Sequence, residues 1–191
     1  MMKNKGLLIT LGVVVLVVWI IGSSGCGTYN NLVTLDESID SSWAQVENVL
    51  KRRYDLIPNL VNTVKGYAKH EKDLLEKITA LRSQWGKATT AGARMQAAKG
   101  LEGMLSRLMV VVERYPDLKA NQGFLKLQDE LSGTENRIAV ERRRYNEVVR
   151  AYNITVKRFP GKLWATMFGF EKRDVYFEVA EEEKAVPKVE F

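Results

Sequence analysis

The sequence predicts an all-α protein, an antiparallel four-helix bundle of long helices that follows one N-terminal transmembrane helix. Three observations predict this class. Residues 7–21 form an uncharged and mostly apolar run. From residue 32 onward, apolar side chains recur every three or four positions, which is the spacing of a helix face. Proline is scarce, with 4 residues among 191, so long uninterrupted helices form easily.

The N-terminal segment carries no charge between Lys5 and Asp36. Residues 7–27 are long enough to cross the hydrocarbon layer, which needs about 20 residues. Two lysines precede this segment, and four acidic residues follow it before the next basic one. The positive-inside rule therefore places residues 1–6 in the cytoplasm. We predict a single-pass inner-membrane protein whose helical domain lies on the extracytoplasmic, periplasmic side.

Cys26 keeps a second interpretation open, because a cleaved signal fits the same pattern. The only cysteine follows "SSG", where a lipoprotein signal would be cut and acylated. Ser23 is a poor match to the aliphatic residue usual three positions before such a cysteine. A lipoprotein anchored at Cys26 and a soluble secreted product are thus the alternatives to an uncleaved anchor. One cysteine permits no internal disulfide and suggests no metal cluster.

The first long helix of the bundle is predicted from about residue 30 to residue 87. Pro58 interrupts it, because proline lacks the helix N–H and clashes with the carbonyl four residues earlier. Asp55 can cap the helix as it restarts, with Pro58 inside the new first turn. We therefore predict a kink or short break at residues 54–57.

Three further helices complete the predicted domain, which spans residues 28–175. One covers about 93–114, between the turn-like "TTAG" and the break at "YPDLKANQG". A longer one covers about 119–158 and ends at Pro160, and "GKLWATMFGF" forms a short aromatic-rich helix. Residues 176–191 are predicted to be an irregular tail. Apolar residues recur at a strict spacing of seven along the 119–158 helix, as Phe124, Leu131, Ile138, Tyr145, Tyr152 and Phe159.

Several long motifs identify a family. They are "YNNLVTLDESIDSSWAQVENVLKRRYDLIPNLVNTVKGYAKHE", "RYPDLKANQGFLKLQDELSGTENRIAVERRRYNEVVRAYN", "FPGKLWATMFGF" and "PKVEF". Together they resemble the LemA family over nearly the whole chain after the N-terminal segment. The resemblance implies one membrane segment and a four-helix antiparallel domain, but no catalytic residues. It also implies an association with membrane metalloprotease systems, with stress or envelope roles, or with magnetosome membranes.

No catalytic, metal or cofactor pattern emerges from the sequence, so we predict a protein that is not an enzyme. His70 is the only histidine, and "HEKDL" has leucine where a helical zinc motif needs its second histidine. The net charge of +6 comes from basic residues mixed with acidic ones. A nucleic-acid binder would instead show a basic stripe with stacking aromatic residues. We therefore expect neither a nucleic-acid partner nor a small-molecule substrate.

Arg53 is the single charged break in an apolar series of spacing seven on the first helix: Leu32, Ile39, Val46, Arg53, Leu60 and Tyr67. The middle of the facing seam on the 119–158 helix is polar and contains Glu135 and Glu141. A buried arginine needs a partner, because an unpaired buried charge costs about 3–5 kcal/mol. We predict that Arg53, Glu135 and Glu141 form a polar clamp that sets helix register, as polar core positions do in coiled coils.

The aromatic block near the C-terminus has two interpretations: a cap on one end of the bundle, or a surface that contacts lipid or a partner. Its members are Phe159, Leu163, Trp164, Met167, Phe168 and Phe170. Tryptophan and phenylalanine favour the membrane boundary, so an exposed block would favour the second interpretation.

These observations favour a membrane-anchored helical scaffold or interaction module of the bacterial cell envelope, acting with a protein partner or with copies of itself. Two alternatives stay open. One is an accessory or regulatory subunit of a membrane metalloprotease or stress system. The other is a membrane-remodelling protein. The sequence does not name the partner or the oligomeric state.

Overall fold

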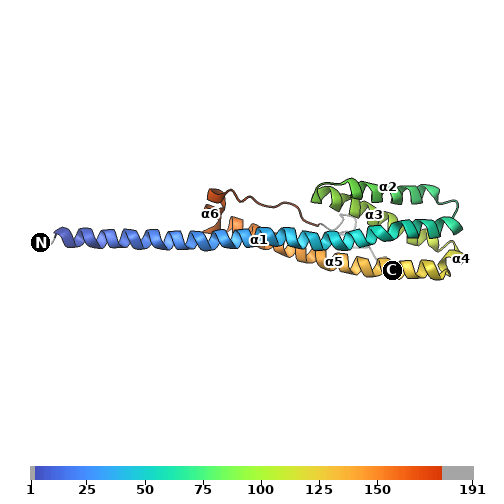
Figure 1. Cartoon of the computed structure of the whole chain (residues 1–191), viewed down its shortest axis with the longest axis horizontal. Helices are drawn as coiled ribbons and strands as arrows, with labels where there is room; N and C mark the ends of the chain where they lie inside the picture. Colours follow the sequence, from blue (N-terminus) through green and yellow to red (C-terminus); the bar gives the residue numbers. More distant parts are fainter. Residues whose placement is uncertain (1–2, 178–191) are drawn as a thin grey trace, which may run out of the picture. The chain divides into compact units, whose positions relative to one another are not determined.

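The computed structural model describes residues 3–177, although side chains are not described for residues 3–10, 17–18 and 20–21. Every regular element in the described part is a helix, so the predicted all-α class is confirmed. The elements are α1 (Lys3–Tyr67), α2 (Lys72–Lys87), α3 (Ala91–Val112), α4 (Pro116–Lys119), α5 (Gln122–Lys157) and α6 (Gly161–Phe168), as Figure 1 shows.

The chain divides into two compact units, and the two longest helices contribute to both. Unit 1 comprises Met1–Asp40 and Glu147–Asp174, and unit 2 comprises Ser41–Asn146 and Val175–Phe191. Unit 1 therefore contains the start of α1, the end of α5 and the whole of α6. Unit 2 contains the rest of α1 and α5 together with α2, α3 and α4. The predicted boundaries at residues 6, 27 and 175 stay predictions, and residues 178–191 of the predicted tail lie outside the described residues.

The spacing-seven series on α1 and α5 supply the buried faces of these helices. Of the twelve positions, only Tyr67 and Phe159 are exposed, and both stand at the end of their series. Tyr67 is the last residue of α1, and Phe159 lies beyond the end of α5. A fixed spacing keeps side chains on one face only while the helix continues. The buried members are Leu32, Ile39, Val46, Arg53, Leu60, Phe124, Leu131, Ile138, Tyr145 and Tyr152.

Helices α2 and α3 pack against each other within unit 2. Gly100 on α3 leaves room for the Leu81 side chain of α2, because a Cβ at this position would lie 2.9 Å from a Leu81 methyl group. Two helix starts in the unit are capped by side chains, which satisfies N–H groups that lack a partner within the helix. The Thr90 hydroxyl accepts a hydrogen bond from the Ala93 N–H, and the Asn121 side chain accepts one from the Phe124 N–H.

The predicted break at residues 54–57 is wrong, because α1 continues through Pro58 to Tyr67. Asp55 is an exposed residue inside the helix and caps nothing. The chain instead turns at residues 68–71, so the predicted first helix is divided there into α1 and α2. Pro58 cannot donate to the Tyr54 carbonyl, but the Nε of Arg82 on α2 donates to that oxygen at 3.2 Å. A tertiary contact thus replaces the hydrogen bond that proline removes.

Over the residues that the structure describes, no helix contains a stretch both long and apolar enough to cross a membrane. Of the predicted anchor at residues 7–27, positions 7–10, 17–18 and 20–21 lie outside the residues whose side chains are described. The anchor therefore stays a prediction.

Candidate functional site

The interior of unit 2 contains a buried arginine. Arg53 on α1 forms an ion pair with Glu135 on α5. The Arg53 side chain is 8% exposed, whereas that of Glu135 is 36% exposed. A guanidinium this far from water needs a carboxylate partner, and α5 supplies one.

The structure does not bring Glu141 to Arg53, which corrects the predicted three-residue clamp. Glu141 accepts a hydrogen bond from Arg144, three residues along the same helix, at 2.8 Å. Successive helical residues are turned by about 100°, so two residues six apart point about 120° away from each other. Only one of the two glutamates can therefore face Arg53.

A second ion pair, which the sequence interpretation missed, lies in the same unit. Arg142 on α5 donates from both terminal nitrogens to one carboxylate oxygen of Glu102 on α3, at 3.1 Å each. The spacing in the sequence could have indicated that Arg142 belongs to this pair of charges, because Arg142 stands seven residues after Glu135 and shares its helix face. We call Arg53, Glu102, Glu135 and Arg142 the polar layer. It links α1, α3 and α5 through two guanidinium–carboxylate pairs.

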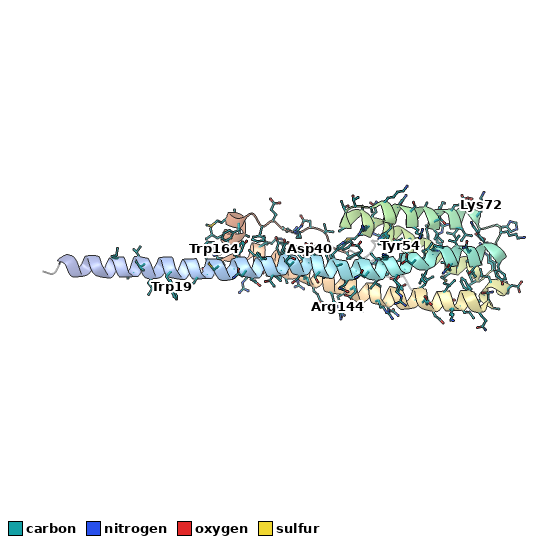
Figure 2. All side chains as sticks on the ribbon, in the orientation of Figure 1. Trp19, Asp40, Tyr54, Lys72, Arg144 and Trp164 are labelled. Atoms are coloured by element: carbon teal, nitrogen blue, oxygen red, sulfur yellow. The ribbon has the colours of Figure 1, made fainter. Side chains whose placement is uncertain are left out.

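Tyr54, the residue after Arg53 on α1, forms an aromatic pair with Trp85 on α2. The rings of Tyr54 and Trp85 stack with their centroids 4.4 Å apart and their planes 14° from parallel. Arg94 lies over the Trp85 ring at 5.5 Å and also pairs with Glu47. Figure 2 labels Tyr54 on α1, where that helix runs alongside α2. These contacts join α1, α2 and α3 in unit 2.

A pocket of about 270 Å³ opens beside the polar layer, at the edge of the Arg53–Glu135 pair. Small-molecule sites usually measure about 300–1,000 Å³ and combine an apolar lining with a few polar groups. This pocket lies just below that range. Two of its charged groups, Arg53 and Glu135, pair with each other, and the third, Glu102, pairs with Arg142. Its lining comprises Arg53, Glu102, Leu105, Ser106, Met109, Gln128, Leu131, Ser132 and Glu135. Elsewhere among the described residues, no three His, Cys, Asp or Glu side chains gather closely enough to hold a metal ion.

The Tyr54 hydroxyl is buried and lacks a hydrogen-bond partner among the described residues. Burial raises its pKa above the ordinary value of 10, and the charges of Arg53 and Arg142 partly oppose that rise. The folded state therefore binds this proton more tightly than the unfolded chain does. The titration of Tyr54 leaves the free energy of unfolding unchanged below pH 10. That free energy falls as the pH rises above 10, because the unfolded chain then loses its proton before the folded state does.

We predict that Tyr54→Phe raises the free energy of unfolding by about 1 kcal/mol at pH 7, because it removes an unpaired buried hydroxyl and keeps the ring. The variant should also lose less stability than the wild type between pH 10 and pH 11. Denaturant unfolding at both pH values measures this. Tyr152→Phe is the matched control, because the Tyr152 hydroxyl donates to the Glu171 carbonyl at 2.9 Å. That variant should be destabilised by about 1 kcal/mol. A loss of stability in Tyr54→Phe would contradict the prediction.

The segment after α6 is held by asparagine side chains of α5, a feature that the sequence interpretation missed. In unit 1, the Asn153 amide exchanges two hydrogen bonds with the backbone of Arg173, at 2.7 and 2.9 Å. In unit 2, the Asn146 amide does the same with Phe177, at 2.8 and 3.0 Å. Each asparagine acts as a peptide group would in a sheet. The two residues are seven apart, and that spacing was the available signal.

The aromatic block is divided between a buried and an exposed part of unit 1. Trp164 is buried on α6, and Figure 2 labels it beside α1. The other side chains of the block are exposed or partly exposed: Phe159, Leu163, Met167, Phe168 and Phe170. Cys26 is also exposed and carries a free thiol.

Comparison with known proteins identifies the family. A profile of the LemA family matches residues 42–191. The chain belongs to the LemA family. It is 27% identical to magnetosome protein MamQ 2 of Paramagnetospirillum magneticum, in an alignment covering 78% of this chain and 64% of that relative. It is 24% identical to magnetosome protein MamQ of Magnetospirillum gryphiswaldense, covering 78% and 65%.

A further LemA-family relative is protein LemA of Metamycoplasma hominis, which is 25% identical over 78% of this chain and 67% of the relative. This LemA-family chain spans slightly less than two thirds of the length of the MamQ proteins that it matches.

Proposed function

We propose that this LemA-family chain is a membrane-anchored helical interaction module of the bacterial cell envelope, without catalytic activity of its own. We also propose the antiparallel four-helix bundle, formed by α1, α2, α3 and α5, as the architecture of unit 2. The alternative function is an accessory subunit of a membrane protease or stress system.

The observation that carries the anchor is the exposure of apolar side chains near the start of α1. All the described side chains at positions 11–16 and 19 are exposed, and the large apolar ones are between 56% and 72% exposed. Soluble proteins rarely leave so continuous an apolar surface in water. A lipid bilayer would cover it. The large apolar residues are Leu11, Val13, Val14, Val15, Leu16 and Trp19.

The polar layer supports a module that binds rather than catalyses. Both of its carboxylates are engaged by guanidinium groups, and the pairs link three helices. Paired interior charges of this kind set register between helices. Protein partners or further copies of the chain would then bind to outer helix faces.

Alkaline extraction of membranes from cells that express the full chain tests the anchor. We expect the wild type and the matched variant Cys26→Ser to stay in the membrane pellet, because residues 7–27 span the bilayer. If Cys26→Ser alone were released, the chain would be a lipoprotein. Release of both proteins would contradict membrane anchoring.

The native mass of the wild-type protein, after mild detergent extraction of the same membranes, tests the interaction role. A multiple of 21.7 kDa, after allowance for detergent, supports self-assembly. A larger mixed complex supports an accessory subunit and supplies its partner for identification. A monomer that co-purifies with nothing would contradict both roles.

A further inference from the structure

The outer face of α6 is apolar and exposed. Leu163 and Met167 lie four residues apart on this helix and are 54% and 62% exposed, and Phe159, two residues before the helix begins, is 81% exposed. The opposite face of the helix is packed, since Trp164 and Ala165 are buried. Three large exposed apolar side chains within nine residues suit a surface that contacts lipid or protein.

Side-chain contacts hold α6 against α1 within unit 1. A Cβ at Gly25 would lie 2.8 Å from the Trp164 ring, so the glycine lets the indole approach the α1 backbone closely. Four residues later, the Tyr29 ring packs edge-on against Phe168 and Phe170, with centroids 4.8 and 5.8 Å apart. Helix α6 therefore lies beside α1 at residues 25–29, where the proposed anchor ends.

The short interval along α1 sets the level of α6 relative to the anchor. The proposed anchor ends at residue 27, so Gly25 and Tyr29 lie about 3 Å before and after its end along the helix axis. The polar headgroup region adds about 5–8 Å on each side of the hydrocarbon layer, so residues 25–29 fall where the two regions meet. With the anchor in the bilayer, the exposed face of α6 stands at the level of the membrane surface.

Exposed basic residues precede and begin α6, and the nearest acidic residue that follows it is Glu171. Residues 151–170 contain Lys157, Arg158 and Lys162 but no acidic residue, and all three basic residues are exposed. The adjoining part of α1 adds no negative charge, because residues 6–35 are uncharged. Apolar side chains flanked by exposed lysine and arginine are typical of helices that lie in the interface of anionic membranes.

We propose that the outer face of α6 inserts into the bilayer surface next to the anchor, with anionic phospholipid headgroups bound by Lys157, Arg158 and Lys162. This inference rests on the proposed anchor. It gives the chain a second contact with lipid, which would fix the orientation of unit 1 at the membrane.

Single spin labels on the full chain test the docking. Each label is placed in a Cys26→Ser background, and the protein is reconstituted in vesicles of phosphatidylcholine with phosphatidylglycerol. Met167→Cys reports on α6, Leu16→Cys reports on the anchor, and Ala151→Cys is the matched control on the exposed surface of α5 in the same unit. Relaxation by oxygen indicates lipid, and relaxation by a water-soluble nickel chelate indicates water.

We expect the Met167 and Leu16 labels to favour oxygen and the Ala151 label to favour the chelate. A Met167 label in water beside a Leu16 label in lipid overturns the docking but not the anchor. A Leu16 label in water overturns both. A Met167 label shielded from both reagents means that protein covers α6, which also overturns the docking.

The lipid dependence tests the three basic residues. Each lysine or arginine near an anionic surface raises binding about fivefold. Replacing Lys157, Arg158 and Lys162 together with glutamine should therefore shift the Met167 label toward the chelate in anionic vesicles. The Met167 label of the protein that keeps its three basic residues should show the same shift toward the chelate in vesicles of phosphatidylcholine alone. A label position that neither change affects would contradict headgroup binding.

Discussion

Glu135→Leu is expected to lower the free energy of unfolding by about 3 kcal/mol, the lower end of the cost of leaving a buried ion-pair partner alone. The substitution leaves the Arg53 guanidinium without its carboxylate, and that side chain is only 8% exposed. The lower end applies because the Arg53 side chain is not fully buried and lines a pocket. Denaturant unfolding of the full chain in detergent measures the loss.

Removing the arginine instead of the glutamate should lower the free energy of unfolding by less, and this difference makes the prediction specific. Arg53→Leu leaves Glu135, whose side chain is 36% exposed and can be hydrated. We expect a loss of about 1 kcal/mol for Arg53→Leu, and near-wild-type stability for the double variant, since well-packed apolar residues replace buried ion pairs without loss. Glu141→Leu is the matched control. Its pair with Arg144 lies within one helix, so removing it should change stability by less than about 0.5 kcal/mol.

Equal losses in Arg53→Leu and Glu135→Leu would contradict the assignment of Arg53 as the more costly charge. Additive losses in the double variant would contradict the clamp itself, because they would mean that the two side chains do not interact.

Pro58→Ala is expected to raise the free energy of unfolding by about 1 kcal/mol. Proline inside a helix costs about 3 kcal/mol, of which the restricted unfolded chain returns up to about 1 kcal/mol and the Arg82 hydrogen bond about 1 kcal/mol. Alanine restores the N–H that donates to the Tyr54 carbonyl. In the wild type, the Arg82 Nε donates to that oxygen instead. The Pro58→Ala substitution should therefore remove the contribution of this Arg82 hydrogen bond to stability.

A double-mutant cycle tests this coupling. Arg82→Met keeps the aliphatic stem and removes the donor, and we expect it to cost about 1 kcal/mol in the wild type. The cost should vanish in the Pro58→Ala background. An equal cost in both backgrounds would show that Arg82 does not replace the missing helix hydrogen bond.

Local periodicity predicted most of the helical architecture. Spacing at three, four and seven residues depends only on neighbours along the chain, so it indicates which face of a helix is buried. Ten of the twelve spacing-seven positions on α1 and α5 are buried as a result. The rule failed where a helix ends, at Tyr67 and Phe159.

Pro58 shows the limit of local rules. Proline chemistry predicted a break at residues 54–57, but the helix continues because Arg82, 28 residues from Tyr54, supplies a donor. Intrinsic preferences yield to tertiary contacts in this way. The turn at residues 68–71 contains no proline, and the sequence interpretation missed it.

The sequence by itself determined the helical class, the uncharged N-terminal segment and the isolation of Arg53 in an apolar face, because each depends on order along one helix. Only the tertiary structure decided which charges meet. Arg53 pairs with Glu135 and not Glu141, and Arg142 pairs with Glu102. Pairing across helices depends on how each helix is rotated about its axis and on its position along that axis relative to its neighbours. Those quantities are set by the packing of side chains far apart in the chain.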